Sequence, residues 1–286
     1  MKATIPPLCL ERSGPSYPSQ LAQIDGPPDK LWARGDLKLL DPGKARIAIV
    51  GSRAPTPYGM VQAERFGREL AAAGVIVVSG LARGVDQAAH RGALDAGGDT
   101  IAVLGSGLDK PWPAVPMVDE IAAKGLLLSE YEPRTPPRPH HFPLRNRIIS
   151  GLSDGLIVIE AAAASGSLIS ARWAVDQGRE VFALPGRVDQ PMSAGCHRLL
   201  REGAGLVEGP AELLSLIYGD SPAPAAADKA PANLGRVESV LRGETLSADE
   251  IAGALGRPID RVLVELVQLE LVGRVVRGAG GLYRLG

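Results

Sequence analysis

From Ile47 onward the chain alternates between two hydrophobic patterns. Short apolar runs predict buried strands at Ile47–Val50, Val75–Val78, Thr100–Leu104, Leu126–Ser129, Gly155–Ile159 and Glu180–Leu184. Between these runs, apolar residues recur every three or four positions, which predicts helices at about 57–73, 84–96, 114–124, 144–153 and 166–178. Because strands that alternate with helices form right-handed βαβ units, the pattern predicts an α/β fold, a doubly wound parallel sheet with helices on both faces.

Small, polar or charged residues follow each predicted strand. They are Gly51-Ser52-Arg53, Ser79-Gly80, Gly105-Ser106-Gly107, Ser129-Glu130, Glu160 and Pro185-Gly186. In a parallel sheet all carboxyl ends of the strands lie along one edge, and open α/β sheets bind ligands in the crevice at that edge. We therefore expect the binding site there.

The patterns outside this region divide the chain into parts. Residues 1–44 are rich in proline and glycine, and we interpret them as an extended lead-in that packs on a main domain of residues 45–218. Residues 219–231 have no apolar periodicity and consist mostly of proline, alanine and charged residues, which predicts a linker. Residues 232–286 then form a separate small domain.

This last segment predicts a winged helix-turn-helix. Three amphipathic helices are expected at Leu234–Leu241, Ser247–Leu255 and Pro258–Leu271, and two β-like pieces at Arg274–Arg277 and Leu282–Leu285. Ser247 and Glu250 match a capping box. The segment carries seven basic and seven acidic residues, and Glu265 and Glu270 lie on the third helix. Such charges oppose entry into a duplex groove, which leaves a protein-contacting or accessory role equally open.

Length, charge and cysteine content narrow the class of protein. The formal net charge of −1 excludes a broadly basic nucleic-acid coat, so polyanion binding requires a local cluster. Cys9 and Cys196 are the only cysteines, and their separation gives neither a disulfide framework nor metal-ligand spacing. No apolar run is long enough to cross a bilayer. We expect a soluble protein of the reducing cytoplasm with no membrane attachment.

The first candidate anion site follows the Ile47–Val50 strand. Gly51 permits close approach of a ligand, Ser52 offers a hydroxyl, and Arg53 offers a fork that can grip one phosphate through two hydrogen bonds. The helix beginning near Pro57 adds a positive dipole end. The alternative is an ordinary strand-to-helix turn with Arg53 in solvent.

The second candidate is the basic stretch from Pro133 to Arg147. It holds four arginines and two histidines and no carboxylate. This is a local basic cluster that the near-neutral net charge of the whole chain does not reveal. Phe142 within it could stack on a nucleobase while the neighbouring arginines hold phosphates. Alternatively, Phe142 anchors the core and Asn146 caps a helix.

The third candidate, Ser165-Gly166-Ser167, lies at a predicted helix start and offers either a phosphate site or a simple cap.

Catalytic patterns are scarce: the four histidines lack metal-ligand or nucleophile–base spacing, and His90 fits a structural hydrogen-bonding role. The Walker pattern and Gly-x-Gly-x-x-Gly after the first strand are both absent, so neither NTP hydrolysis nor a dinucleotide cofactor is indicated.

Several stretches taken together resemble the DNA processing protein A (DprA/Smf) family. The resemblance spans about residues 17–218 and rests on Ile49–Arg53, Ser79–Asp86 with His90, Thr100–Asp109, Leu128–Tyr131, Phe142–Ser153, Glu160-Ala161, Ser165–Leu168 and Leu184–Gly186. It implies an extended Rossmann-like domain that binds single-stranded DNA at the carboxyl edge of its sheet. It also implies RecA loading in natural transformation and homologous recombination, displacement of single-strand-binding protein, homodimers, no cofactor, no metal and no catalytic activity.

The resemblance also assigns roles to residues. Gly51, Ser52 and Arg53 would hold a phosphate, Phe142 would stack on a base, and the segments Arg145–Arg147 and Ser165–Ser167 would complete the pocket. The full expected DNA-binding set is Gly51, Ser52, Arg53, Ser79, Gly80, Arg83, Gly105, Gly107, Lys110, Arg138, Phe142, Arg145, Asn146, Arg147, Ser165, Gly166 and Ser167.

The chain departs from the family pattern at several positions. Trp112-Pro113-Ala114 stands where a basic residue often follows Tyr-Pro, which leaves Lys110 as the only nearby cation, and Ser170 and His197 stand where Thr and Asn are usual. The basic residue usual before Phe-Pro does not align cleanly with Arg138–His141. The number of phosphate contacts therefore stays open.

Two other functions remain as alternatives. One is a nucleotide phosphoribohydrolase of the lysine-decarboxylase-like family, whose Pro-Gly-Gly-x-Gly-Thr-x-x-Glu pattern is replaced here by Glu160–Ser167. The other is a regulator that reads duplex DNA through residues 247–271, which the balanced charge of that domain disfavours.

Overall fold

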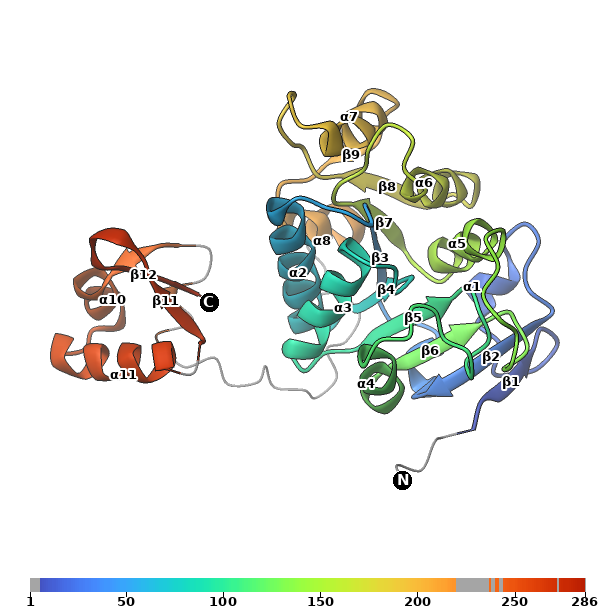
Figure 1. Cartoon of the computed structure of the whole chain (residues 1–286), viewed down its shortest axis with the longest axis horizontal. Helices are drawn as coiled ribbons and strands as arrows, with labels where there is room; N and C mark the ends of the chain where they lie inside the picture. The colour runs from blue at the N-terminus through green and yellow to red at the C-terminus, as the bar shows by residue number, and fades with distance from the viewer. Residues whose placement is uncertain (1–5, 220–236, 238–239, 242–243, 272, 286) are drawn as a thin grey trace. The chain divides into compact units, whose positions relative to one another are not determined.

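The computed structural model describes residues 6–219, 237, 240–241, 244–271 and 273–285. The chain divides into two compact units, residues 1–229 and 230–286, which are considered separately (Figure 1). No helix among the described residues has the length and apolar character needed to cross a membrane.

A nine-stranded sheet in the order β1-β2-β6-β5-β4-β3-β7-β8-β9 forms the centre of the larger unit. Its parallel part consists of β3 (Arg46–Val50), β4 (Ile76–Ser79), β5 (Thr100–Leu104), β6 (Leu126–Ser129), β7 (Gly155–Val158), β8 (Glu180–Ala183) and β9 (Gly205–Leu206). The six predicted strands are confirmed, each end within one residue of its expected position. The chain order reverses at β3, because β4 pairs with one side of it and β7 with the other.

The lead-in is more than an extended segment, and this corrects the sequence-based expectation. It forms β1 (Leu8–Glu11), α1 (Ser19–Ala22), β2 (Lys30–Gly35) and the 3₁₀ turn Leu37–Leu40. Strand β2 pairs antiparallel with β6, and β1 extends the sheet beyond it, so the sheet is mixed rather than wholly parallel. Leu31 and Ala33, two residues apart on β2, both lie in the core on one face of the sheet, a strand spacing that the surrounding Pro and Gly residues obscure in the sequence.

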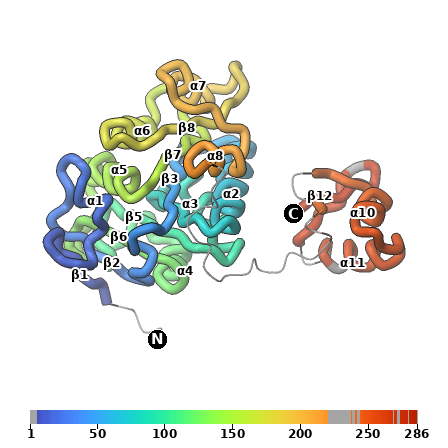
Figure 2. Tube along the Cα trace, turned by 180° about the vertical axis from the view of Figure 1, so that it is seen from behind, coloured from blue at the N-terminus to red at the C-terminus, as the bar shows by residue number. Residues whose placement is uncertain are grey.

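Helices cover both faces of the sheet, as predicted (Figures 1 and 2). One face carries α1, α5 (His141–Gly151), α6 (Ser167–Asp176) and α7 (Ala194–Arg201). The other carries α2 (Pro57–Ala72), α3 (Val85–Asp95), α4 (Met117–Lys124) and α8 (Pro210–Tyr218). Helix α5 begins at His141, three residues before the predicted start. Pro143 does not prevent this, because it lies in the first turn of the helix, where a proline is tolerated.

Strand β3 is buried on both faces, as a central parallel strand must be. Ile47 and Ile49 pack with α2 and α3, whereas Ala48 and Val50 pack with the opposite helical layer. The short β-branched run therefore places the loop that follows it, beginning at Gly51, at the centre of the carboxyl edge.

A polar network ties the lead-in and α8 to the start of β3. Asp154 accepts hydrogen bonds from Gln20 Nε2 at 3.0 Å, from the backbone N–H of Arg46 at 2.9 Å and from the hydroxyl of Tyr218 at 2.8 Å. The Arg46 guanidinium donates in turn to the carbonyl oxygens of Leu39 and Asp41. Segments far apart in sequence are thus joined at the amino edge of the sheet.

The smaller unit contains α10 (Ala248–Leu255), α11 (Ile259–Leu271) and a three-stranded sheet of β10 (Leu246–Ser247), β12 (Leu282–Leu285) and β11 (Val275–Arg277), in that order. The predicted hairpin is confirmed, and β10 adds a strand that the sequence pattern did not reveal. Ser247 and Glu250 form the predicted capping box. The expected helix Leu234–Leu241 lies largely outside the described residues. Glu265, half-buried, pairs with Arg257 at 2.6 Å.

Candidate functional site

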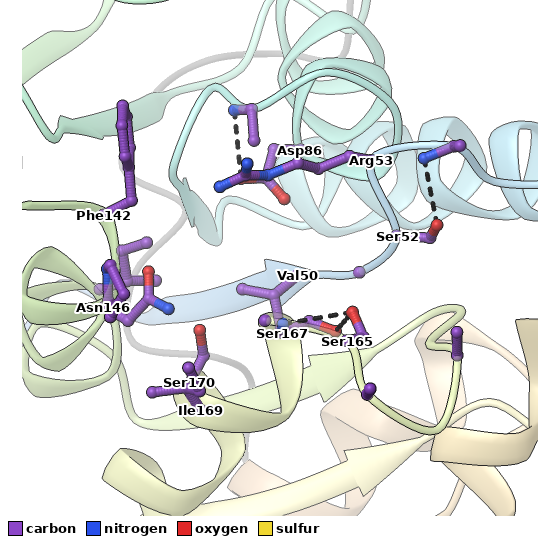
Figure 3. Close-up of a pocket in the computed structure, with 18 of the residues that line it drawn as sticks. Val50, Ser52, Arg53, Asp86, Phe142, Asn146, Ser165, Ser167, Ile169 and Ser170 are labelled. Carbon is purple, nitrogen blue, oxygen red and sulfur yellow. Dashed lines mark hydrogen bonds between the residues drawn. The ribbon is translucent and has the colours of Figure 1, made fainter. Parts of the chain in front are cut away.

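A pocket of about 480 Å³ opens at the carboxyl edge, where the loops after β3 and β7 approach one another (Figure 3). Its walls come from the β3 loop, the start of α3, and helices α5 and α6. Because the strand order reverses at β3, this is the topological switch point at which open α/β sheets bind ligands. The sequence predicts a binding site at this edge, and the structure has a pocket there.

The β3 loop forms one wall. Ser52 is buried, and its Oγ accepts a hydrogen bond from the backbone N–H of Ala54 at 3.1 Å. A Cβ at Gly51 would lie 2.7 Å from Val85 on α3. Close packing of α3 therefore explains the glycine without a ligand, and Ser52 stiffens the turn that presents Arg53.

The helix that follows this loop already holds an anion. Glu160, at the end of β7, accepts hydrogen bonds from the backbone N–H of Thr56 at 2.8 Å and from its hydroxyl at 2.6 Å. Thr56 in turn caps α2 by accepting from the N–H of Gly59 at 3.1 Å. The expectation that the start of α2 is open to phosphate is corrected: a buried carboxylate fills that position.

The N-terminus of α6 also faces the pocket. Ser165 and Ser167 share a hydrogen bond between their hydroxyls at 2.8 Å, and Ser165 also accepts from the N–H of Ser167 at 3.3 Å. Gly166 is exposed between them and has open space where a side chain would stand. Helix N-termini favour anions, so this turn offers the dipole end that α2 does not.

Arg53 and Phe142 meet at the rim. The Arg53 guanidinium carbon lies 5.7 Å from the centroid of the Phe142 ring, within the range of a cation–π contact. The arginine is exposed and the ring half-buried. A Cβ at Gly105 would lie 2.7 Å from the ring, so the absence of a side chain at that position lets the Phe142 ring pack against the β5 loop.

Arg145 lines the pocket from beneath but is not free. It is 4% exposed, and Nη1 donates to the carbonyl oxygens of Gly80, at 2.7 Å, and of Val103. Burial lowers the pKa of Arg145 to about 10, so the guanidinium remains charged at neutral pH. Its role is to brace the β4 and β5 loops and to place positive charge under the pocket. Its Nε also donates to Asn146 Oδ1 at 3.3 Å.

Asp86 is a pocket residue that sequence reasoning left out of the site. Its Oδ2 accepts from the backbone N–H groups of Gly80 at 3.1 Å and Ala82 at 3.3 Å. Burial raises the pKa of Asp86 to about 6, although the charge of Arg145 opposes the shift. Its place in the first turn of α3, just after a tight glycine turn, was the available signal.

Arg147 points elsewhere. Nη1 lies 3.0 Å from Glu130 Oε2, and Nε donates to the carbonyl oxygen of Gly26 at 2.9 Å. The basic stretch contains no carboxylate of its own, but Glu130, which directly follows β6, pairs with its Arg147. Arg147 holds α5 against the lead-in.

Part of the expected binding set converges on the pocket. The lining residues are Gly51, Ser52, Arg53, Phe142, Arg145, Asn146, Ser165, Gly166 and Ser167. Of the described residues, the members of the set that do not line it are Ser79, Gly80, Arg83, Gly105, Gly107, Lys110, Arg138 and Arg147. Ser79 is fully buried and donates to the carbonyl oxygen of Ile49 at 2.6 Å, while Arg83, Lys110 and Arg138 are exposed.

Apolar residues complete the pocket and were not predicted. Ile149 of α5, Ile169 of α6 and Met192 join Ala162 and Ala164 in the lining. Figure 3 shows Asn146 and Ser170 facing the same space as Phe142. A concave, mainly apolar pocket with a few convergent polar groups is the usual form of a ligand site.

Comparison with known families covers both units. The family described as DNA recombination-mediator protein A matches residues 9–218, and the DprA winged helix domain matches residues 221–281. Protein Smf of Escherichia coli (strain K12) is 42% identical over 286 residues, with 94% of this chain and 75% of the relative covered. DNA processing protein DprA of Bacillus subtilis (strain 168) is 44% identical over 194 residues, with 67% of this chain and 65% of the relative covered.

Solved structures of DNA processing protein A are also similar to this chain. The X-ray structure of DprA from Streptococcus pneumoniae has 42% identity and a TM-score of 0.70, covering 73% of this chain and 74% of that one. DNA processing protein A from Helicobacter pylori, studied for its single-stranded DNA binding mode, has 36% identity and a TM-score of 0.69, covering 77% of this chain and 99% of that one. The chain therefore belongs to the DNA recombination-mediator protein A family, whose members carry the names DprA and Smf.

Proposed function

We propose that the chain binds single-stranded DNA at the switch-point pocket, without catalysis, and loads RecA onto the bound strand during natural transformation and homologous recombination. The observation that carries the proposal is the Arg53–Phe142 pair at the rim, an exposed guanidinium over an aromatic ring. An aromatic ring can stack on a base, and a neighbouring guanidinium can hold the phosphate of the same nucleotide through two hydrogen bonds. Both contacts are independent of base identity, as is typical of proteins that bind single strands of any sequence.

The ring supplies the base contact. A base lying between Arg53 and Phe142 would need a gap of about 7 Å, two van der Waals separations, and the present gap is 5.7 Å. Arg53 is exposed, so its side chain can swing outward and let the base stack on Phe142. The apolar lining behind the ring favours an aromatic base over water.

The phosphates have two donors. Arg53 offers two parallel N–H bonds, and the α6 N-terminus offers backbone N–H groups beside the Ser165 and Ser167 hydroxyls. The buried charge of Arg145 adds attraction without direct contact.

The absence of catalysis is supported by the loop after β7, where the stretch Glu160–Ser167 replaces the phosphoribohydrolase pattern and does not supply the glutamate that ends it. Glu160 itself accepts hydrogen bonds from the backbone N–H and the hydroxyl of Thr56. RecA loading, displacement of single-strand-binding protein and dimer formation are part of the proposal because the chain belongs to this family, and a cytoplasmic location follows from that role.

The test is a fluorescence-anisotropy titration of a labelled oligo-dT strand and a matched duplex at two salt concentrations. We expect the single strand to bind more tightly, with a log–log salt slope of about −0.7 per phosphate contact. Arg53→Ala should weaken binding several-fold and leave the melting temperature unchanged.

Arg68→Ala is the matched control, because Arg68 is a partly exposed arginine that pairs with Glu64 on α2 outside the pocket. Equal loss of affinity in both variants would mean that general charge, not the pocket, binds DNA. A preference of the wild type for duplex would move the function to the winged helix.

A further inference from the structure

We infer that Asp86 is a positioning residue for the pocket: its carboxylate accepts the hydrogen bonds that fix the β4 loop, and this loop holds Arg53 at the rim and Arg145 beneath the pocket. The inference rests on the proposed function and extends it to a residue outside the expected DNA-binding set. The β4 loop is defined here as residues 80–84, between β4 and α3.

The β4 loop contains a backbone conformation that needs support. Leu81 has a φ of 57°, in the left-handed region, and among the described residues it is the only one other than glycine with a positive φ. Its side chain is fully buried, in the same apolar cluster as Leu94 of α3 and Leu104 of β5. A glycine would adopt this conformation freely but would leave a cavity in that cluster. Other contacts therefore have to hold the backbone at Leu81.

Asp86 supplies that support. The backbone N–H groups of the residues before and after Leu81, Gly80 and Ala82, donate to one oxygen, Asp86 Oδ2, at 3.1 and 3.3 Å. Neighbouring N–H groups that converge in this way form a nest, which binds anions. Asp86 is 6% exposed and lies in the first turn of α3, which fixes its position. The carboxylate therefore fills the nest from within the chain.

The second oxygen of this carboxylate is free. Asp86 lines the pocket, and its Oδ1 forms no hydrogen bond with the residues that the structure describes. The charged side chains that act on the carboxylate are Arg145 and Arg53, and Figure 3 shows Asp86 beside Arg53. Since one oxygen holds both N–H groups, an amide in place of the carboxylate would keep these two hydrogen bonds.

The first residue of the loop holds Arg145. Nη1 of Arg145 donates to the carbonyl oxygen of Gly80 at 2.7 Å. A Cβ at Gly80 would lie 2.5 Å from the same guanidinium, so the loop backbone runs directly against it. Gly80 thus contacts Asp86 through its N–H and Arg145 through its carbonyl oxygen. A change in the turn at Leu81 would therefore move this guanidinium.

The other end of the loop packs against the residues on both sides of Arg53. The backbone N–H of Val85 donates to the carbonyl oxygen of Ser52 at 3.2 Å. A Cβ at Gly84 would lie 2.5 Å from that oxygen and 2.6 Å from Pro55. Because the Arg53 side chain is exposed, these backbone contacts set the point from which it reaches the pocket rim.

The experiment measures the affinity of the full chain for a labelled oligo-dT strand by anisotropy at two salt concentrations. Asp86→Ala removes the acceptor and should weaken binding about tenfold or more, because the charge-assisted contact of Arg53 with a phosphate is misplaced. The log–log salt slope should become shallower by about 0.7, the value of one phosphate contact. Asp86→Asn keeps an oxygen acceptor and should bind within about threefold of the wild type. Asp86→Leu is a second variant without an acceptor and replaces Asp86→Ala if that variant does not fold.

Asp95→Ala and Asp95→Asn are the matched controls. Asp95 is an exposed carboxylate at the end of the same helix, where it pairs with Arg91 outside the pocket. Both variants should bind the strand like the wild type, because they remove the same charge without touching the β4 loop.

A double variant tests whether Asp86 acts through Arg53. In the Arg53→Ala background, Asp86→Ala should weaken binding by a smaller factor than it does in the wild type, because the contact that it positions is already gone. Full additivity of the two substitutions would contradict the inference.

The remaining outcomes separate the inference from the proposed function. Wild-type affinity in folded Asp86→Ala, or equal losses in Asp86→Ala and Asp86→Asn, would overturn the positioning role. Loss of binding in Arg53→Ala with no effect of any Asp86 variant would leave the pocket standing and remove Asp86 from it. Absence of binding by the wild type would remove the proposed function itself.

Discussion

Glu160 and Thr56, 104 residues apart in sequence, are joined by two hydrogen bonds to a single carboxylate. This contact ties the end of β7 to the start of α2 and fills the anion position at that helix N-terminus. Packing confirms how tightly the carboxylate is held, because a side chain at Gly59 would collide with it. We therefore propose that the N-terminus of α6, rather than that of α2, holds a phosphate.

Glu160→Gln should lower the free energy of unfolding by about 1–3 kcal/mol, because it removes a charge-assisted bond and turns an amide toward donors. Urea denaturation measures this, with Glu64→Gln on the surface of α2 as the control. Unchanged stability would show that the contact does not hold the two elements together. We also expect no release of base from AMP by the wild type, which chromatography detects.

Phe142→Ala should reduce affinity for a single strand by the value of one stacked base, about 1–3 kcal/mol. Phe142→Trp should keep most of that affinity, since a planar ring remains. Anisotropy titrations give both values. Leu144→Ala, on the same helix and 47% exposed, is the matched control. Wild-type affinity in Phe142→Ala would exclude stacking on this ring.

His90 should make the fold sensitive to acid. The Thr100 hydroxyl donates to the carbonyl oxygen of Val77 at 2.8 Å, so His90 Nδ1, 2.7 Å from that hydroxyl, carries the proton and Nε2 is unprotonated. Burial lowers the pKa of His90 from 6.5 to about 3. Between these values the unfolded chain binds a proton that the folded chain does not.

The stability that His90 contributes is therefore complete above pH 6.5 and is lost as the pH falls toward 3, at up to about 1.4 kcal/mol per pH unit. His90→Asn keeps a donor near the Nδ1 position and lacks this titration. Urea unfolding of both proteins from pH 7.5 to about pH 5 should show their stability difference shrinking. Asp86, whose raised pKa acts in the opposite direction, is common to both and cancels. A constant difference would contradict the assignment.

Tyr218→Phe should cost about 1 kcal/mol of unfolding free energy, because it removes the 2.8 Å hydrogen bond to Asp154 while Gln20 and the Arg46 backbone still satisfy that carboxylate. Tyr58→Phe, at a ring 50% exposed, is the control and should be neutral. Equal urea midpoints for the two variants would remove Tyr218 from the network.

The sequence by itself determined the six central strands, the helices between them and the capping box at Ser247. These features follow from local periodicity, because a buried parallel strand needs a continuous apolar run and a helix needs an apolar stripe. It also determined the edge of the sheet that carries the site, since the direction of parallel strands puts every strand end on one side.

Only the tertiary structure decided which charged residues are free. Arg145 and Arg147 are near neighbours of one type, yet one donates to the carbonyl oxygen of Gly80, 65 residues away, and the other pairs with Glu130. Arg34 of the lead-in likewise neutralises Asp109, 75 residues away. The periodicity of apolar residues indicates which positions of one segment are buried. It does not indicate which charged side chains pair, because the two partners lie on segments that come together only when the sheet assembles.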